Sequence, residues 1–396
     1  MRGTVIVSAC RTAIGAYGGT LKNTSSADLG AVVIKEAVKL AGIQPNQVDQ
    51  VFMGEVRQST EASNSARVAA LRAGLPEEVP AFTINRLCAS AMQAVSSGVK
   101  EIQTGDADIA VVGGMESMSR APYYIRDARW GGGRVHMVDS NVEGGPSAQP
   151  MEVYGDDLGM IQTAENVARE FNISREDQDE FAIRSQQLAA KAIEEGLFQE
   201  EIVPVEVKQR KKTIIFDQDE HPRPNTTMEI LAKLRPVVSK DGSVTAGNAC
   251  GRNDGAAAMV IMSREKSDQL GIKPRALIIA QSAVGVSPRI MGIGPVPATR
   301  KVLEKAGMTL EDIDLIELNE AFASQALASM RELGMNMNKV NVNGGAIALG
   351  HPLGCTGTRL IVTLLNNMER RGDRYGLATL CVGGGQGMAT IIERLD

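Results

Sequence analysis

Two regions of the chain follow the same plan of apolar and polar positions. In residues 28–56, apolar side chains with a helical period precede Gly42, and a strand-like apolar run follows. Residues 298–320 repeat this order around Gly307, with the same spacing from the glycine to the next strand. A glycine directly after a helical pattern is typical of a helix C-terminus. The repeat predicts an internal duplication.

The parallel between the two regions continues along the chain, and in each region the last predicted strand ends in glycines. The predicted elements are a strand at 82–85, a helix at 89–102 and a strand at 109–114 in the first region, and a strand at 340–343, a helix at 356–368 and a strand at 377–385 in the second. Strands that alternate with helices are typical of parallel sheets built from βαβ units. We therefore predict two related α/β halves.

Residues 119–250 differ from both halves and are predicted to form an insertion. The segment is rich in glycine and proline around 131–133 and 144–150, and it lacks a clean alternation of strands and helices. A helix is predicted at 163–170, and Ser174 to Asp177 has the pattern of a capping box that opens a longer helix. The charged segment 208–235 is interpreted as a solvated loop.

These patterns divide the chain into three predicted units. The N-terminal α/β half comprises residues 1–118 together with 251–269, the inserted loop domain comprises 119–250, and the C-terminal α/β half comprises 270–396.

Composition narrows the class of protein. The 396 residues are 43% hydrophobic and 22% charged, which indicates a globular chain, and the net charge of −5 argues against nucleic-acid binding. The 5 cysteines include no CxxC pair, so neither a disulfide framework nor a metal site is expected. No apolar stretch reaches the roughly 18 residues of a membrane span, and the apolar N-terminal run is too short for a secretion signal. We expect a soluble, cytoplasmic protein without membrane contact.

Three segments carry candidate chemistry. Cys88 lies where a predicted strand ends and a helix begins, so the helix dipole is expected to lower the thiol pKa, although a small buried residue would also suit this place. His351 lies in a glycine-rich run that suits a residue moving protons. Cys381 precedes Val-Gly-Gly-Gly-Gln-Gly, where bare backbone N–H groups suit an oxyanion hole.

Eight segments spread over essentially the whole chain resemble the thiolases, coenzyme A-dependent acyltransferases that make or cleave a carbon–carbon bond beside a thioester. The segments are Asn85–Ala94, Gly113–Ser119, Val244–Asn248, Asn253–Ala258, Met291–Ala298, Leu318–Ala323, Gly344–Pro352 and Cys381–Gly387. The resemblance implies a duplicated, five-layered α-β-α-β-α core, with residues 119–250 as the loop domain over which coenzyme A lies.

The resemblance also implies a role for each catalytic candidate. Cys88 would be the nucleophile that becomes acylated, and His351 would take its proton and point at the thioester oxygen. Asn319 would hold a water that completes this oxyanion site. Cys381, with a pKa shifted toward neutrality, would be the acid/base at the α-carbon. The N–H groups of Cys88 and Gly383 would form a second oxyanion hole.

Further positions resemble the coenzyme A site of the family. Arg223 matches a position near the nucleotide phosphates, and the remaining matches lie along the pantetheine and acyl chain: Met160, Ala246, Cys250, Met291 and Phe322. Cys250 departs from the usual serine, and Gly159 stands where acetoacetyl-type members carry histidine. The contacts of coenzyme A at these two positions therefore stay open.

The resemblance implies three functions. The favoured one is acetyl-CoA C-acetyltransferase, which interconverts two acetyl-CoA with acetoacetyl-CoA and CoA through acyl-Cys88. The alternative is a broader-chain degradative 3-ketoacyl-CoA or 3-oxoadipyl-CoA thiolase of fatty-acid metabolism. The segment from Asn85 to Cys88 is similar to that group, whereas Arg129 to Gly132 is similar to the acetoacetyl type.

A catalytically silent acyl-CoA- or lipid-binding protein is disfavoured, because all the reactive side chains remain. Coenzyme A and acetyl-CoA are expected as substrates, with no tightly bound cofactor, no metal and no nucleic acid. A homodimer or homotetramer is expected. Chain length, direction and oligomer size stay open.

Overall fold

The computed structural model describes residues 2–126, 128–131, 135–155, 157–209 and 212–395. Residues 132–133 of the predicted glycine-rich stretch and 210–211 of the charged segment lie outside these ranges.

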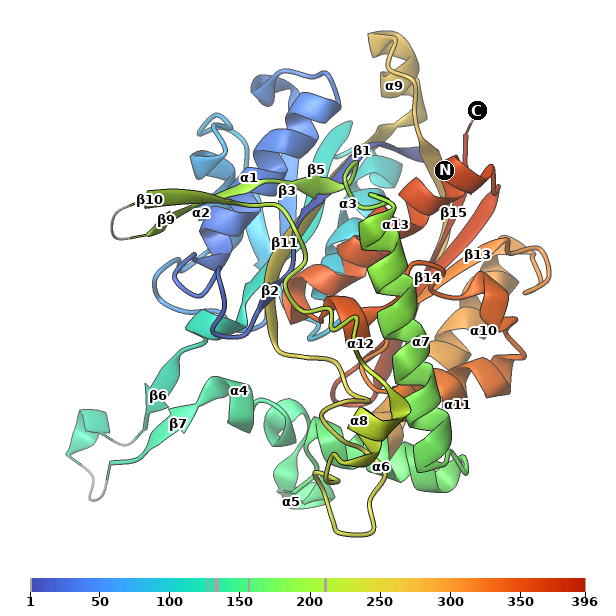
Figure 1. Ribbon diagram of the computed structural model, residues 1–396. Coiled ribbons are helices and arrows are strands. Elements are labelled where there is room, and N and C mark those ends of the chain that lie inside the picture. Colours follow the sequence, from blue (N-terminus) through green and yellow to red (C-terminus); the bar gives the residue numbers. More distant parts are fainter. Residues whose placement is uncertain (1, 127, 132–134, 156, 210–211, 396) are drawn as a thin grey trace.

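One large mixed sheet runs through the molecule, and it consists of two sets of strands (Figure 1). In the order of the sheet, the strands of the first half are β4 (Ala81–Ile84), β3 (Gln50–Gly54), β5 (Ile109–Ser117), β11 (Asn253–Ser263) and β1 (Thr4–Thr12). Those of the second half follow as β12 (Ala276–Gly285), β15 (Gln386–Arg394), β14 (Tyr375–Val382) and β13 (Leu315–Leu318). The halves join where Val5 and Ile6 of β1 pair with Leu277 and Ala276 of β12.

The pairing pattern confirms the internal duplication. In the first half β3 and β5 are parallel, and β11 and β1 continue the sheet antiparallel. In the second half β13 and β14 are parallel, and β15 and β12 continue it antiparallel. The two halves therefore share one topology, which the common order of elements in the sequence had predicted.

The strand predicted at 340–343 is wrong, because only Val340 forms a bridge, parallel to Ile316. Asn341 has a φ of 48°, which takes the backbone out of the extended region. Its side chain instead accepts a hydrogen bond from Leu318 N at 2.9 Å and donates to Leu318 O at 2.8 Å. A side chain thus replaces the backbone ladder that β4 makes in the other half.

Helices cover the sheet in three layers (Figure 1). The layers are α1 (Ser26–Leu40) and α2 (Ser65–Arg72) on the first half, α3 (Ser90–Thr104) and α13 (Leu353–Arg371) in the middle, and α10 (Pro295–Ala306) and α11 (Ala323–Leu333) on the second half. Val5 and Val7 of β1 point into the core under α1, whereas Ile6 points into the middle core. Alternation along buried strands thus produces the predicted α-β-α-β-α architecture.

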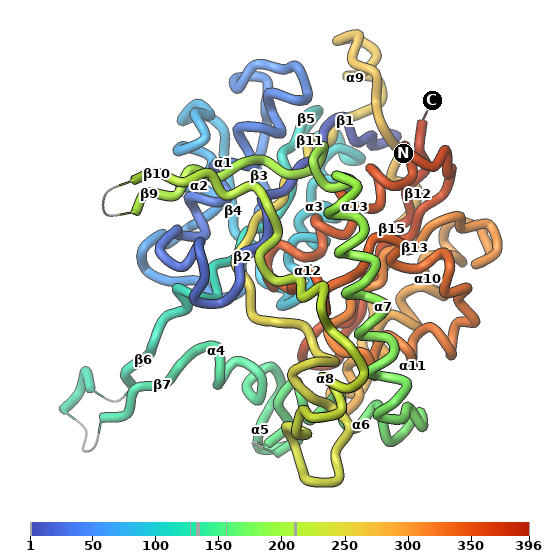
Figure 2. Tube along the Cα trace, viewed as in Figure 1, coloured from blue at the N-terminus to red at the C-terminus, as the bar shows by residue number. Residues whose placement is uncertain are grey.

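The segment between β5 and β11 forms further helices and short strands. It contains the arm, a hairpin of β6 (Tyr123–Ile125) and β7 (Met137–Asp139) that projects from the layers (Figure 2). The others are α4 (Ser140–Glu143), α5 (Met151–Tyr154), α6 (Met160–Glu170), α7 (Arg175–Glu194), β8 (Ile202–Val203), β9 (Val205–Gln209), β10 (Lys212–Phe216) and α8 (Met228–Ala232).

Two predictions for this segment have different outcomes. The capping box is confirmed, since the side chains of Ser174 and Asp177 each accept from the other's backbone N–H. The solvated-loop interpretation of 208–235 is wrong in part, because β10 pairs with β9 and α8 lies inside the segment. Val205, Val207 and Phe216 of the hairpin are buried in the core under α1, so apolar burial as well as strand pairing holds it.

The remaining regular elements are short: β2 (Gly15–Ala16), α9 (Arg264–Leu270) and α12 (Ala346–Leu349). Within the described ranges, no helix is long and apolar enough to cross a membrane. The boundaries predicted between the three units stay a prediction.

Candidate active site

The two middle helices bring their N-termini together, and each is preceded by a reactive side chain. Cys88 stands just before α3 and His351 just before α13. The first turns of the helices pack on each other, because the Thr358 hydroxyl donates to Ala91 O at 3.4 Å and a Cβ on Gly357 would clash with the backbone of Met92. Two residues far apart in sequence are thus presented at one place.

Cys88 is held in a tight turn between β4 and α3. Leu87 has a φ of 47°, a strained value for a leucine, and the Ser90 side chain accepts from Arg86 N at 2.9 Å and donates to Leu87 O at 2.6 Å. The N–H groups of Gly383 and of Cys88 itself point at the sulfur and lower its pKa, but burial raises the pKa by more. The expected lowering of the Cys88 pKa is therefore wrong.

His351 is a neutral base with a defined tautomer. Thr356 donates its hydroxyl proton to Pro352 O at 2.9 Å, so its oxygen accepts from His351 Nδ1–H at 2.6 Å. Nε2 then carries the lone pair, which accepts a long hydrogen bond from Asn319 Nδ2 at 3.5 Å. Burial, followed by the charge of Arg359, lowers the pKa of His351 to about 3. Burial therefore keeps the imidazole uncharged through the neutral range.

Asn319 directly follows β13, and its two side-chain atoms differ in their partners. Its backbone N–H donates to Thr379 O at 3.0 Å, which fixes the residue to β14. The Nδ2 group faces His351, whereas Oδ1 is buried without a hydrogen-bond partner among the described residues. A buried amide oxygen of this kind suits a small polar molecule, such as a water.

Cys381 lies at the end of β14 in a small apolar cluster. Burial raises the pKa of its thiol well above the usual value, and the neighbouring Cys88 and Cys250 thiols add to the shift. The expectation of a pKa near neutrality is wrong, because the low dielectric of the cluster disfavours the thiolate. The other members of the cluster include Met160, Met291 and Phe322.

Gly383 follows in the turn between β14 and β15. A Cβ on this glycine would lie 3.2 Å from Leu87 Cδ1 and 3.3 Å from Met160 Sδ. The turn is therefore packed against the turn that carries Cys88, which explains how the Gly383 N–H reaches the sulfur.

The other predicted positions line a neighbouring cavity of about 180 Å³. Arg223, Ala246 and Cys250 lie in its wall, and burial raises the pKa of Cys250 to about 12. His221 was missed by sequence reasoning, although the Glu-His-Pro-Arg run marks it. Burial, and then the charge of Arg223, lowers the pKa of this imidazole.

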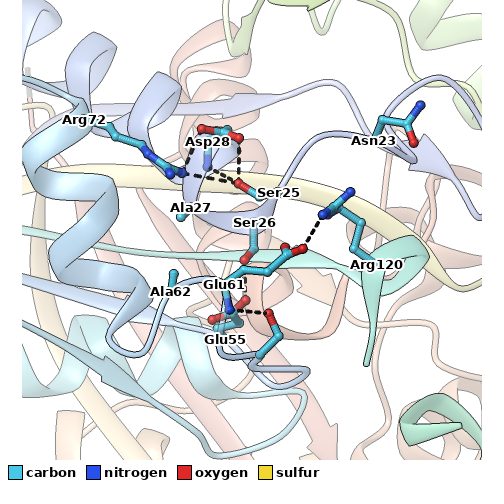
Figure 3. A pocket seen from close by; sticks show the side chains of 11 residues that line it. Asn23, Ser25, Ser26, Ala27, Asp28, Glu55, Glu61, Ala62, Arg72 and Arg120 are labelled. Atoms are coloured by element: carbon cyan, nitrogen blue, oxygen red, sulfur yellow. Dashed lines mark hydrogen bonds and ion pairs between the residues drawn. The ribbon is translucent and has the colours of Figure 1, made fainter. Parts of the chain in front are cut away.

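A second cavity, of about 230 Å³, lies at the N-terminus of α1 (Figure 3). Four of its charged side chains form two ion pairs, Arg72 with Asp28 at 2.9 Å and Arg120 with Glu61. None of the predicted site residues belongs to its described lining. Within the described ranges, no group of three or more His, Cys, Asp or Glu side chains is arranged to hold a metal ion. The expected absence of a metal stays a prediction.

Comparisons with known proteins agree with this geometry. The family model "Thiolase, N-terminal domain" matches residues 4–265, and "Thiolase, C-terminal domain" matches 272–394. A Syntrophomonas wolfei protein named acetyl-CoA acetyltransferase is 53% identical, with 100% of both chains covered. A Pseudomonas aeruginosa protein named beta-ketoadipyl-CoA thiolase is 50% identical, again over 100% of both chains. The crystal structure of the Bacillus anthracis acetyl-CoA acetyltransferase matches with a TM-score of 0.95 and 48% identity, covering 100% of this chain and 99% of that one.

Proposed function

Because the chain belongs to the thiolase family, we propose that it is an acetyl-CoA acetyltransferase. It converts two acetyl-CoA into acetoacetyl-CoA and CoA, and the reverse, through an acetyl group carried on Cys88. The observation that carries this proposal is the pairing of a buried thiol, which faces two N–H groups, with a neutral imidazole just before the adjoining helix α13.

The acyl-transfer step uses Cys88, His351 and Gly383. Because burial raises the pKa of the thiol, a base must remove its proton as the sulfur attacks, and the unprotonated Nε2 of His351 carries the lone pair that accepts it. The carbonyl oxygen becomes an oxyanion beside the N–H groups of Cys88 and Gly383. Its collapse breaks the bond to the sulfur of CoA, and the expelled thiolate takes the proton from His351. Removing one such donor typically costs roughly 10²–10³ in rate.

The carbon–carbon step uses Cys381, Asn319 and His351. In cleavage, the bond between C2 and C3 of acetoacetyl-CoA breaks, C3 stays on the sulfur of Cys88, and the electron pair moves to the enolate of acetyl-CoA. The Cys381 thiol then protonates C2, and its raised pKa keeps this proton available at neutral pH. The enolate oxygen is stabilised beside His351, by the small polar molecule, such as a water, that the Asn319 side chain holds there.

Coenzyme A and acetyl-CoA are substrates in this proposal, and no cofactor is tightly bound. The nucleotide phosphates meet the guanidinium of Arg223, which suits phosphate through paired donors. Pantetheine passes Ala246 and Cys250, and the acyl group reaches the apolar cluster around Cys381, formed with Met160, Met291 and Phe322.

The chain assembles as a homotetramer through the arm. The arm carries exposed apolar side chains: Trp130 is 88% exposed, Met137 69% and Tyr123 60%. Exposed apolar groups on a projecting hairpin are typical of a protein contact. Light scattering should give a tetramer, and replacing Trp130 and Met137 by serine should leave a smaller species.

The free cysteines suit a reducing compartment, and the cytoplasm is the proposed location.

The second candidate function is cleavage of longer or dicarboxylic 3-ketoacyl-CoA, favoured by the 50% identity to the beta-ketoadipyl-CoA thiolase. The test measures thiolysis of acetoacetyl-CoA, 3-ketodecanoyl-CoA and 3-oxoadipyl-CoA side by side, with Cys88→Ala as the background. A preference for acetoacetyl-CoA supports the acetyltransferase. Faster cleavage of either longer substrate replaces it with the second candidate, and no turnover above background contradicts both.

A further inference from the structure

The first turn of α13 rests directly on the backbone of the first half of the sheet. Gly54 ends β3, Gly114 lies in β5, and a Cβ on either would clash with the carbonyl oxygen of Gly354 in that turn. A Cβ on Gly354 would itself lie 2.6 Å from Met115 O and 2.7 Å from the Cα of Glu55. Three glycines therefore allow the helix that follows His351 to touch the sheet that leads to Cys88.

Glu116 of β5 holds this crossing together. The residue is fully buried, and one carboxylate oxygen accepts from Gly354 N at 2.8 Å and from Val56 N at 3.0 Å. The other oxygen accepts from Arg57 N at 3.0 Å. The Gly354 N–H is one of the unpaired donors at the start of a helix, where a carboxylate is favoured. Nothing in the proposed chemistry above uses this group.

We infer that Glu116 is a positioning residue: its carboxylate holds the first turn of α13 against β3 and β5, and so places His351 for proton transfer at Cys88. The inference rests on the proposed function, because it assigns to Glu116 an action through His351. Hydrogen bonds link this turn to the imidazole. Pro352 O accepts from Cys355 N at 3.0 Å and from Thr356 Oγ1 at 2.9 Å, and Thr356 Oγ1 accepts from His351 Nδ1–H.

Titratable groups interact with Glu116 from three packed segments: Glu55 after β3, Cys88 before α3 and Cys355 in α13. Burial, and then the charge of Glu55, raises the pKa of Glu116 to about 7. Glu55 is held by the Ser26 and Ser65 hydroxyls, and Glu55 and Ser26 line the cavity at α1 (Figure 3).

The sign of the pH dependence follows from which form holds the turn. The ionised carboxylate accepts all three N–H groups, whereas the protonated form carries a hydrogen on one of these oxygens and loses acceptor capacity. Activity should therefore fall as the pH drops through about 7. This fall in activity near pH 7 is the acidic limb of the pH profile. His351 cannot cause this limb, because its pKa is about 3.

The experiment records kcat/KM for thiolysis of acetoacetyl-CoA from pH 5.5 to 9 in wild type and three variants. Glu116→Gln should lower the plateau at least tenfold and abolish the limb near 7. Glu55→Gln leaves the hydrogen bonds of Glu116 in place but removes the like charge, so the limb should move about one unit to lower pH with an unchanged plateau. Glu61→Gln, in the same cavity but paired with Arg120, is the matched control and should move nothing.

A second readout separates this inference from the proposed function. The rate of alkylation of Cys88 by iodoacetamide, corrected with Cys88→Ala, should show the same limb and the same shift in Glu55→Gln, whatever the substrate. An active wild type whose limb stays in place in Glu55→Gln overturns the inference and leaves the function standing. A wild type without thiolysis, whose alkylation limb still moves, contradicts the function alone. If Glu116→Gln does not fold, Glu55→Gln carries the test.

Discussion

The hydroxyl of Thr356 is the most direct point at which to perturb the site without touching a reacting atom. It accepts from His351 Nδ1–H and donates to Pro352 O, so it selects the tautomer that leaves Nε2 unprotonated. Thr356→Val keeps the branched shape but removes both hydrogen bonds. The Nδ1–H group is then left buried without a partner, or the proton moves to Nε2 and the base is lost.

The size of the effect can be worked from the hydrogen bond. Leaving a buried donor unsatisfied costs about 1–3 kcal/mol. Since 1.36 kcal/mol is tenfold in rate, kcat/KM should fall roughly 5- to 150-fold. The pKa of His351 is about 3, so the loss should be of similar size at pH 6 and at pH 9.

The assay compares kcat and KM for CoA in thiolysis of acetoacetyl-CoA, with Thr356→Ser as the matched control that retains the hydroxyl. The serine variant should stay within about threefold of wild type, because the acceptor for Nδ1–H remains. The reasoning is refuted if Thr356→Val keeps more than half of the wild-type kcat/KM, or if the serine variant loses as much as the valine variant.

Three further perturbations test other parts of the site and fold. Cys250→Ser puts a stronger hydrogen-bond partner in the cavity wall. Because a hydrogen bond contributes about 0.5–1.5 kcal/mol, KM for CoA should fall roughly two- to tenfold with kcat unchanged, and a higher KM would contradict this. Arg223→Ala should raise KM for CoA roughly 10- to 100-fold but leave turnover of acyl-pantetheine unaffected, and equal losses on both would refute a phosphate contact. Arg11→Met leaves the buried carboxylates of Glu201 and Asp219 unpaired, so urea unfolding should show a loss of about 3–5 kcal/mol, and an unchanged midpoint would contradict the buried pair.

Local patterns predicted the elements well where the stabilising interactions are themselves local. The capping box of Ser174 and Asp177 closes within one turn, and the glycine after the α10 pattern, Gly307, takes the left-handed conformation of a C-cap. The strand expected at 340–343 does not form, although its apolar and polar residues alternate. The side chain of Asn341, rather than a neighbouring strand, makes the hydrogen bonds to the backbone of Leu318.

The reactive side chains were found because each stands at the end of an element inside a distinctive run of residues. Their protonation could not be predicted in the same way. A helix N-terminus suggests a lowered pKa for Cys88, yet the sulfur is buried in the middle core, and desolvation outweighs the two N–H groups that face it. Glu116 was visible only as part of a family-like segment, because its partner Gly354 lies on the other half of the chain.

The amino-acid sequence by itself determined the duplication, most of the strands and helices that the two halves share, and the identity of the reactive groups, since periodicity, caps and short motifs act between neighbours in the chain. Only the tertiary structure decided which tautomer His351 adopts, how far each thiol is from ionising, and which carboxylate ties the helix that follows His351 to the sheet of the first half. These properties depend on desolvation and on hydrogen bonds between distant segments, and both come into being only when the two halves pack on each other.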